Sequence, residues 1–174
     1  MTLGFKLNQW NDFVIKHPLG NIFQTPEMYE VYLKTKNYEP ILVTVINNNE
    51  IKGILLACNI KENRFLGSLT SRSIIIGGPL IKNNDSLILT QLLKKYEQKI
   101  KKKVVYSQIR NLVDTSNLKQ TFIDNGFDYD EHLNILINLE KSEQELWDAM
   151  TRDRKKSIKK GQKELEVKLI SYEN

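Results

Sequence analysis

The amino-acid sequence predicts an α/β fold with a mixed, mainly antiparallel central sheet flanked by helices. Helical and strand-like patterns alternate along the chain, an order typical of this class. The longest β-branched run, Ile74–Ile76, is stopped by Gly77, Gly78 and Pro79, which is typical of a strand buried on both faces. With 174 residues, of which 40% are hydrophobic, residues 1–174 are expected to form a single domain with a sizeable core.

Two helices are expected at the start of the chain. Apolar residues recur at helical spacing over residues 6–16, and His17-Pro18 ends that pattern. Thr25 is a good N-cap and Pro26 suits the first helical position, so a second helix is expected to run from there to about residues 34–37.

Three strands are expected next. Residues 40–46 and 51–60 are apolar and β-branched, and the asparagine-rich turn at 47–50 predicts that they form an antiparallel hairpin. The third strand is expected over 65–76, with a bend or bulge near Gly67.

The glycine pair that ends the third strand is the first candidate site. Gly77 and Gly78 allow positive φ or a close approach to another group, and Pro79 fixes the direction of the chain. A central strand that ends in such a kink commonly borders a ligand crevice in α/β folds. A purely structural turn is the alternative, and both interpretations stay open.

The second half of the chain again alternates helix and strand. A helix capped at Asn84 or Asp85 is expected to reach about residue 102, and a strand is expected at 104–110. Ser116 is expected to cap a helix that Asn125-Gly126 closes. The remaining expected elements are one extended segment formed by residues 127–129 and 132–139, a helix after the capping box of Ser142 and Glu145, a basic helix, and a last strand at 165–170.

Composition excludes several classes of function. Cys58 is the single cysteine, so an internal disulfide is excluded, and with only two histidines a zinc site is not expected. Cys58 lies in an apolar run and is expected to be a core residue. There is no secretory signal pattern and no apolar run long enough to span a bilayer, so we expect a cytoplasmic protein; transient contact with a membrane surface stays open.

The positive charge is concentrated near the C-terminal end. Residues 152–163 carry a net charge of +6, whereas the whole chain carries +5. On a helix these cations would recur every three or four residues and repel one another, and phosphate is the obvious ligand to offset that repulsion. A solvated helix without a ligand is the alternative. The candidate phosphate- or tRNA-binding residues are Arg152, Arg154, Lys155, Lys156, Lys159 and Lys160.

Four motifs together resemble a known family. They are Phe23-Gln24-Thr25 before an aromatic helix, the Ser-Arg…Gly-Gly-Pro strand, the Asn-Gly-Phe turn with the segment after it, and the basic run from Arg154 to Lys160. In this order they resemble the FemAB-type peptidoglycan-bridge aminoacyltransferases, and in particular the first GNAT-like (acyl-CoA N-acyltransferase-like) domain of that two-domain family.

The resemblance implies transfer of an amino acid from aminoacyl-tRNA to the peptide of a peptidoglycan precursor that is bound in a cleft of the first domain. The implied partners are the precursor and the aminoacyl-tRNA donor, with no DNA and no other cofactor. In this reading Gly77 and Gly78 border the cleft, and the residues implied to contact the precursor are Lys36 (or Lys34), Tyr106 and Arg110. No residue stands out as a general base, and the catalytic residues stay unassigned.

The sequence departs from this pattern in two ways. It ends where the second domain of the family would begin. It also lacks the Gly-rich turn, Arg/Gln-x-x-Gly-x-Gly/Ala, that acyl-CoA-dependent enzymes use, because the segment from Arg72 to Gly78 has the wrong spacing. Two other functions stay open: a stand-alone acyl-CoA-dependent N-acyltransferase, and a non-catalytic module that binds RNA or phosphate.

Overall fold

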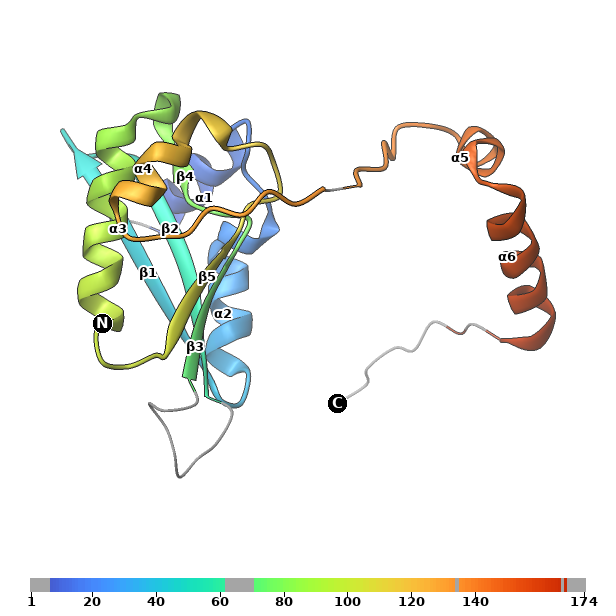
Figure 1. Cartoon of the computed structure of the whole chain (residues 1–174), viewed down its shortest axis with the longest axis horizontal. Helices are drawn as coiled ribbons and strands as arrows, with labels where there is room; N and C mark the ends of the chain where they lie inside the picture. The colour runs from blue at the N-terminus through green and yellow to red at the C-terminus, as the bar shows by residue number, and fades with distance from the viewer. Residues whose placement is uncertain (1–6, 62–70, 134, 167, 169–174) are drawn as a thin grey trace. The chain divides into compact units, whose positions relative to one another are not determined.

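The computed structural model describes residues 7–61, 71–133, 135–166 and 168, and the chain divides into two compact units, Met1–Asn134 and Ile135–Asn174. Each unit is described by itself. Unit 1 contains α1 (Leu7–Lys16), η1 (Ile22–Gln24), α2 (Pro26–Lys34), β1 (Tyr38–Asn47), β2 (Glu50–Lys61), β3 (Ser71–Ile76), β4 (Leu80–Ile81), η3 (Lys82–Asn84), α3 (Ser86–Ile100), β5 (Tyr106–Arg110), η4 (Ser116–Leu118) and α4 (Lys119–Asp124). Unit 2 contains α5 (Glu143–Ala149) and α6 (Arg152–Glu164) (Figure 1).

The strands of unit 1 form one mixed sheet. Its order is β1-β2-β3-β5, and the short β4 pairs with β2 beside β3. All pairs are antiparallel except β3–β5, which is parallel and is joined through α3. The predicted α/β class with a mainly antiparallel sheet is confirmed.

The β1–β2 hairpin forms where the sequence predicts it. Asn47 pairs with Glu50, and the two residues between them, Asn48 and Asn49, have φ angles of 49° and 60°. A two-residue loop with both φ angles positive matches the right-handed twist of the strands, and asparagine tolerates this conformation better than most residues.

The helices begin at the predicted caps. The Thr25 hydroxyl accepts a hydrogen bond from the Met28 N–H at 3.2 Å, and Pro26 occupies the first position of α2. Asp85, rather than Asn84, caps α3, because its carboxylate accepts the N–H groups of Leu87 and Ile88 at 2.8 and 3.4 Å. In unit 2 the Ser142–Glu145 capping box is present at the start of α5.

Each face of the sheet has its own apolar core. Helices α3 and α4 pack on one face, where Leu92 and Phe122 meet Ile75 of β3. Helices α1 and α2 pack on the other, where Trp10 and Tyr32 meet β2 and β4. Ile74 and Ile75 are both buried, as expected for a strand in the interior of the sheet.

The strand expected over residues 127–129 and 132–139 is wrong. Its described residues pair with no strand, and Leu133, Ile135 and Leu139 are 100%, 91% and 82% exposed. Alternation of apolar and polar residues shows which side of a segment could be buried, but a strand also needs a partner, which a local pattern does not identify.

Smaller differences concern single elements. Ser116 begins η4 without capping it, and its N–H instead donates to Asp114 at 2.8 Å. The short strand β4 was not predicted from the sequence. Some predictions lie outside the described residues: the start of the third strand, its bend near Gly67, and most of the strand expected at 165–170. Among the described helices, none is long and apolar enough to cross a membrane.

Candidate functional site

The glycine kink after β3 has a fixed conformation. Gly77 and Gly78 have φ angles of +82° and +71°, and the Gly77 N–H donates to the Arg110 carbonyl of β5 at 2.9 Å. The side-chain Nε2 of Gln24 donates to the carbonyls of Gly77 and Gly78 at 2.6 and 2.8 Å. Gln24 is itself fully buried, and its main-chain carbonyl accepts the indole N–H of Trp10 at 2.7 Å. The kink therefore belongs to a buried hydrogen-bond network, which makes it rigid.

A second group of polar residues approaches the kink from the loop after β5. A Cβ atom on Gly78 would clash with Oδ1 of Asn111, and the positive φ of Gly78 would strain any other residue there. Asn111 donates to the Thr115 hydroxyl at 2.9 Å, and that hydroxyl lies 3.1 Å from the Tyr129 hydroxyl. These contacts provide the structural role that the sequence analysis kept as an alternative for the glycines.

One side of β5 is open. Tyr106, Gln108 and Arg110 point to the side of the sheet that carries α1 and α2 and are all exposed, whereas Ser107 and Ile109 point toward α3 and α4. Arg110 donates to Oε1 of Gln108 through Nε at 3.1 Å and through a terminal nitrogen at 3.0 Å. The open face of β5, meaning Tyr106, Gln108 and Arg110, offers an aromatic ring and a cation along one line.

The predicted precursor-binding residues fall at two ends of the sheet. Arg72 of β3 pairs with Tyr106, and Ile76 pairs with Arg110, next to Gly77. Tyr106 therefore lies at one end, and Arg110, Gly77 and Gly78 lie at the other, about 13 Å away at about 3.3 Å per residue. The open face of β5 connects the two ends.

Lys36 lies at the same end as Tyr106. It is exposed in the turn between α2 and β1, next to Asn37, whose carbonyl accepts the Lys61 N–H at 3.0 Å. Tyr38 of β1 pairs with Ile60 of β2, Ile60 pairs with Arg72 of β3, and Arg72 pairs with Tyr106. Residues 38 and 106 therefore lie at the same end of the sheet.

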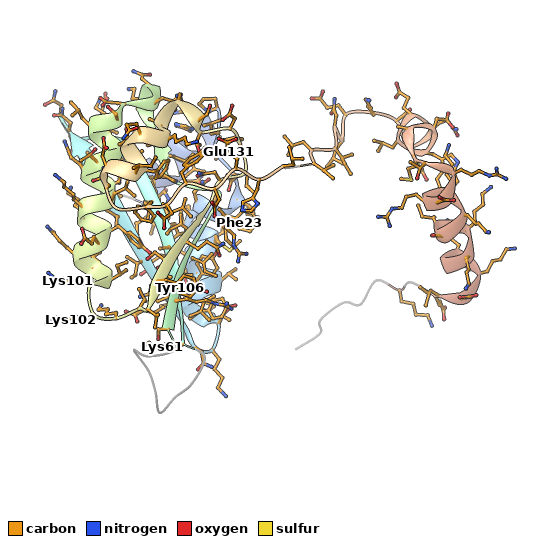
Figure 2. The ribbon with its side chains drawn as sticks, in the orientation of Figure 1. Phe23, Lys61, Lys101, Lys102, Tyr106 and Glu131 are labelled. Carbon is orange, nitrogen blue, oxygen red and sulfur yellow. The ribbon has the colours of Figure 1, made fainter. Side chains whose placement is uncertain are left out.

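Further cations surround this end of the sheet. Glu39 pairs with Lys61 at 3.3 Å and with Lys103 at 3.8 Å. Figure 2 shows Lys61, Lys101 and Lys102 at the end of the sheet where Tyr106 lies. We call this group the cationic end: Lys36, Lys61, Lys101, Lys102 and Lys103. Positive charge in excess of Glu39 makes it a favourable place for an anionic group.

Unit 1 contains a cavity of about 710 Å³ that was not predicted from the sequence. It lies between α1, the β1–β2 turn and the β4–η3 segment, with Phe13 and Ile51 in its wall and none of the predicted site residues among its lining. His17 holds this region together, since its ring nitrogens lie 3.0 Å from the Ile81 carbonyl and 3.1 Å from the Leu19 N–H. Both ring nitrogens of His17 are therefore engaged in main-chain contacts.

The described residues offer no obvious nucleophile or metal site. Burial raises the pKa of the Cys58 thiol to about 12, so the thiol stays protonated at neutral pH and fits the expected core role. Within the described ranges, no three His, Cys, Asp or Glu side chains are grouped as a metal site would require. The arrangement in unit 1 suits binding and positioning of an anionic ligand.

The six predicted phosphate-binding residues all lie on one helix, α6 of unit 2. Nζ of Lys155 and Nζ of Lys159 lie 6.0 and 5.9 Å from the ring centroid of Trp147 in α5. Lys160 pairs with Glu164 at 3.8 Å. The others are Arg152, Arg154 and Lys156, which are exposed.

Sequence comparisons give no relative: no protein-family model and no curated protein sequence matches this chain. Solved structures do match. FemX superposes with a TM-score of 0.64 at 18% identity over 91% of this chain, which spans 42% of the FemX chain. A transcriptional regulator from Bacillus halodurans C-125 superposes with a TM-score of 0.53 at 21% identity, over 79% of this chain and 96% of the regulator chain. A probable acetyltransferase superposes with a TM-score of 0.52 at 15% identity, over 82% of this chain and 97% of the acetyltransferase chain.

These similarities establish the fold. The chain has the GNAT-like fold of N-acyltransferases and of FemX, as the sequence analysis expected. The chain spans less than half the length of FemX.

Proposed function

We propose that this chain, which has a FemX-like acyltransferase fold, is the first domain of a FemAB-type aminoacyltransferase. Such an enzyme moves an amino acid from aminoacyl-tRNA to the peptide of a peptidoglycan precursor in the cytoplasm. The similarity to FemX over 91% of this chain supports this choice, as do the sequence motifs that occur in the order of the family. The two-domain organisation belongs to the proposal as well, because the chain covers 42% of FemX.

The observation that carries the proposal is the open face of β5. It presents Tyr106 and Arg110 about 13 Å apart on one line, with the cationic end beside Tyr106 and the glycine kink beside Arg110. A peptidoglycan precursor is long and carries a diphosphate and carboxylates. Lysines of the cationic end suit the diphosphate, Tyr106 offers a flat apolar surface, and the Arg110 guanidinium suits a carboxylate.

The chemistry of this reaction needs little from a general base. The amino acid arrives as an ester on tRNA and is already activated, so positioning and electrostatic stabilisation can supply much of the rate. This agrees with a site that provides cations, an aromatic ring and a rigid kink.

The acyl-CoA-dependent N-acyltransferase is the second candidate, because this chain covers 97% of a probable acetyltransferase. One candidate place for the diphosphate of coenzyme A, the start of α3, does not suit it. A helix N-terminus binds a diphosphate through free N–H groups, but the carboxylate of Asp85 already accepts those of Leu87 and Ile88 and would repel an anion.

Binding measurements separate the candidates. We would titrate the chain with soluble nucleotide-linked precursor and, separately, with coenzyme A, and follow the thermal unfolding midpoint. The proposal expects stabilisation by the precursor, and at least a tenfold loss of affinity in Tyr106→Ala, Arg110→Gln and Lys36→Gln. The matched control is Lys94→Gln, an exposed lysine of α3. A rise in the unfolding midpoint with coenzyme A and none with the precursor would favour the acyl-CoA-dependent N-acyltransferase. No rise with either ligand would contradict both candidate functions.

A further inference from the structure

The indole of Trp147 lies against two lysines of the neighbouring helix. Nζ of Lys155 and Nζ of Lys159 are each about 6 Å from the ring centroid, at 6.0 and 5.9 Å. Lys155 also donates to the main-chain carbonyl of Asp148 at 3.3 Å, which connects the end of α5 to α6. The indole is partly exposed, so an aromatic surface lies within the most basic segment of the chain.

The positive charge of α6 is largely uncompensated. Within the described part of unit 2, Lys160–Glu164 is the one ion pair that α6 forms, and both of its side chains are well exposed. Lysines four residues apart on a helix repel each other. The ring of Trp147 attracts Lys155 and Lys159 weakly, but a polyanion would offset the repulsion along the whole face.

Two polyanions are conceivable, a nucleic acid and an anionic membrane surface. A helix that lies in a membrane interface needs a broad apolar face opposite its cations. Ile158 is the single large apolar residue of the thirteen in α6, so this helix has no such face. An aromatic ring among lysines is instead typical of surfaces that bind unpaired nucleic acid.

We propose that Trp147, Lys155 and Lys159 form a binding surface for unpaired RNA. A base stacks on the indole, and the lysines neutralise neighbouring phosphates. The inference deepens the proposed function and rests on it for the identity of the RNA: aminoacyl-tRNA carries its amino acid on an unpaired 3′ end. The proposed stacking assigns Trp147 a function in RNA binding that the positive charge of α6 by itself would not explain.

Tryptophan fluorescence of the wild-type chain is the first test. The chain has two tryptophans, and Trp10 is 1% exposed and bonded to the Gln24 carbonyl, so a ligand that stacks quenches Trp147. We expect a short oligoadenylate to quench the emission and a matched RNA duplex to do so far less. Emission unchanged at saturating oligoadenylate would overturn the stacking.

Variants separate stacking from charge. Trp147→Leu should weaken oligoadenylate binding about tenfold or more and leave the slope of log affinity against log salt unchanged. The double variant Lys155→Gln/Lys159→Gln should reduce the magnitude of that slope by about 1.4, since each phosphate contact on a single strand contributes about 0.7. The matched control for charge is Lys16→Gln/Lys94→Gln on α1 and α3, which should change the slope little. Circular dichroism of each variant checks that the helices remain.

Three results would contradict the inference: equal binding of duplex and single strand, no effect of Trp147→Leu, or binding to vesicles that contain anionic lipid without binding to oligoadenylate. Failure of the RNA-binding inference can be distinguished from failure of the proposed function. Precursor binding that depends on Tyr106, without quenching of Trp147 by oligoadenylate, would contradict only the RNA-binding inference. Quenching without any response to the precursor would remove only the aminoacyltransferase.

Discussion

Nε2 of Gln24 donates a hydrogen bond to the carbonyl oxygen of Gly78 at 2.8 Å, across 54 residues of sequence. The same nitrogen donates to the Gly77 carbonyl at 2.6 Å, and the Asn21 N–H donates to Oε1 of Gln24 at 3.1 Å. The shape of the glycine kink thus depends on a side chain at the start of the fold.

Replacing Gln24 by leucine should destabilise unit 1. The carbonyls of Gly77 and Gly78 would lose their donor, and each unsatisfied buried group costs about 1–3 kcal/mol, so we expect a loss of about 2–6 kcal/mol in unfolding free energy. Urea denaturation measures this. Gln91→Leu, an exposed position on α3, is the matched control and should stay within about 0.5 kcal/mol of wild type.

Alanine substitution of two glycines separates backbone strain from close contact. Gly78 and Gly126 both have positive φ, +71° and +82°, but a Cβ at 126 meets nothing within 4 Å, whereas one at 78 lies 2.3 Å from Oδ1 of Asn111. Gly126→Ala should cost about 1–2 kcal/mol for the left-handed conformation alone. Gly78→Ala should cost at least about 1 kcal/mol more, since overpacking adds to the strain. Equal losses in unfolding free energy would show that Asn111 moves aside without cost.

How well the sequence predicts an element depends on how local its cause is. The β1–β2 hairpin and the caps at Thr25 and Ser142 depend on residues a few positions apart, and all three were predicted correctly. The contact of Gln24 with the kink and the pairing of β4 with β2 depend on distant residues, and neither was predicted from the sequence. A partial signal existed at Asn21, since Asn-x-x-Gln is a capping-box spacing that the structure shows at η1.

The roles of the candidate site residues stay predictions, because the family resemblance supplied them; the structure shows only where these residues lie. The resemblance named Tyr106 and Arg110 on β5, but the strand register decides which residues they lie beside. The register places Tyr106 beside Arg72 and places Arg110 beside Ile76, and so separates Tyr106 from the glycines. The cavity beside His17 is lined by three separate segments of the chain, and no one of them predicts it alone.

Burial of Cys58 makes a pH-dependent contribution to stability. Its pKa is raised from 9.0 to about 12, chiefly by burial, so between those values the thiol ionises in the unfolded chain and stays neutral in the folded one. This contribution is fully present below pH 9 and is lost as the pH rises toward 12. We expect the unfolding free energy to decline above pH 9, and to decline less steeply in Cys58→Ala. The buried Tyr96, whose pKa is also raised by burial, adds a similar decline in both proteins.

The same burial should protect the thiol from reagents. At pH 8, a disulfide reagent should label Cys58 rapidly in urea and very slowly in the native protein. Rapid labelling of the native protein would mean that the α1–α2 side of β2 opens readily.

The cap of α3 can be tested with a neutral and an apolar replacement. Asp85→Asn keeps an acceptor for the Leu87 N–H and should change the unfolding free energy little, whereas Asp85→Ala should cost about 1 kcal/mol. If both variants lose the same amount, the negative charge at the helix start matters more than the hydrogen bond.

The parallel pairing of β3 with β5 has a consequence for the order of folding. The β1–β2 hairpin closes a two-residue loop, but β5 can add to the sheet only after the whole of α3 has been brought across it. Closing the longer loop has the larger entropic cost, so this edge should assemble last. Pulse-labelling during refolding should find the amides of residues 106–110 protected later than those of residues 41–45. The strand that carries the open face of β5 would then also be the slowest part of unit 1 to become native.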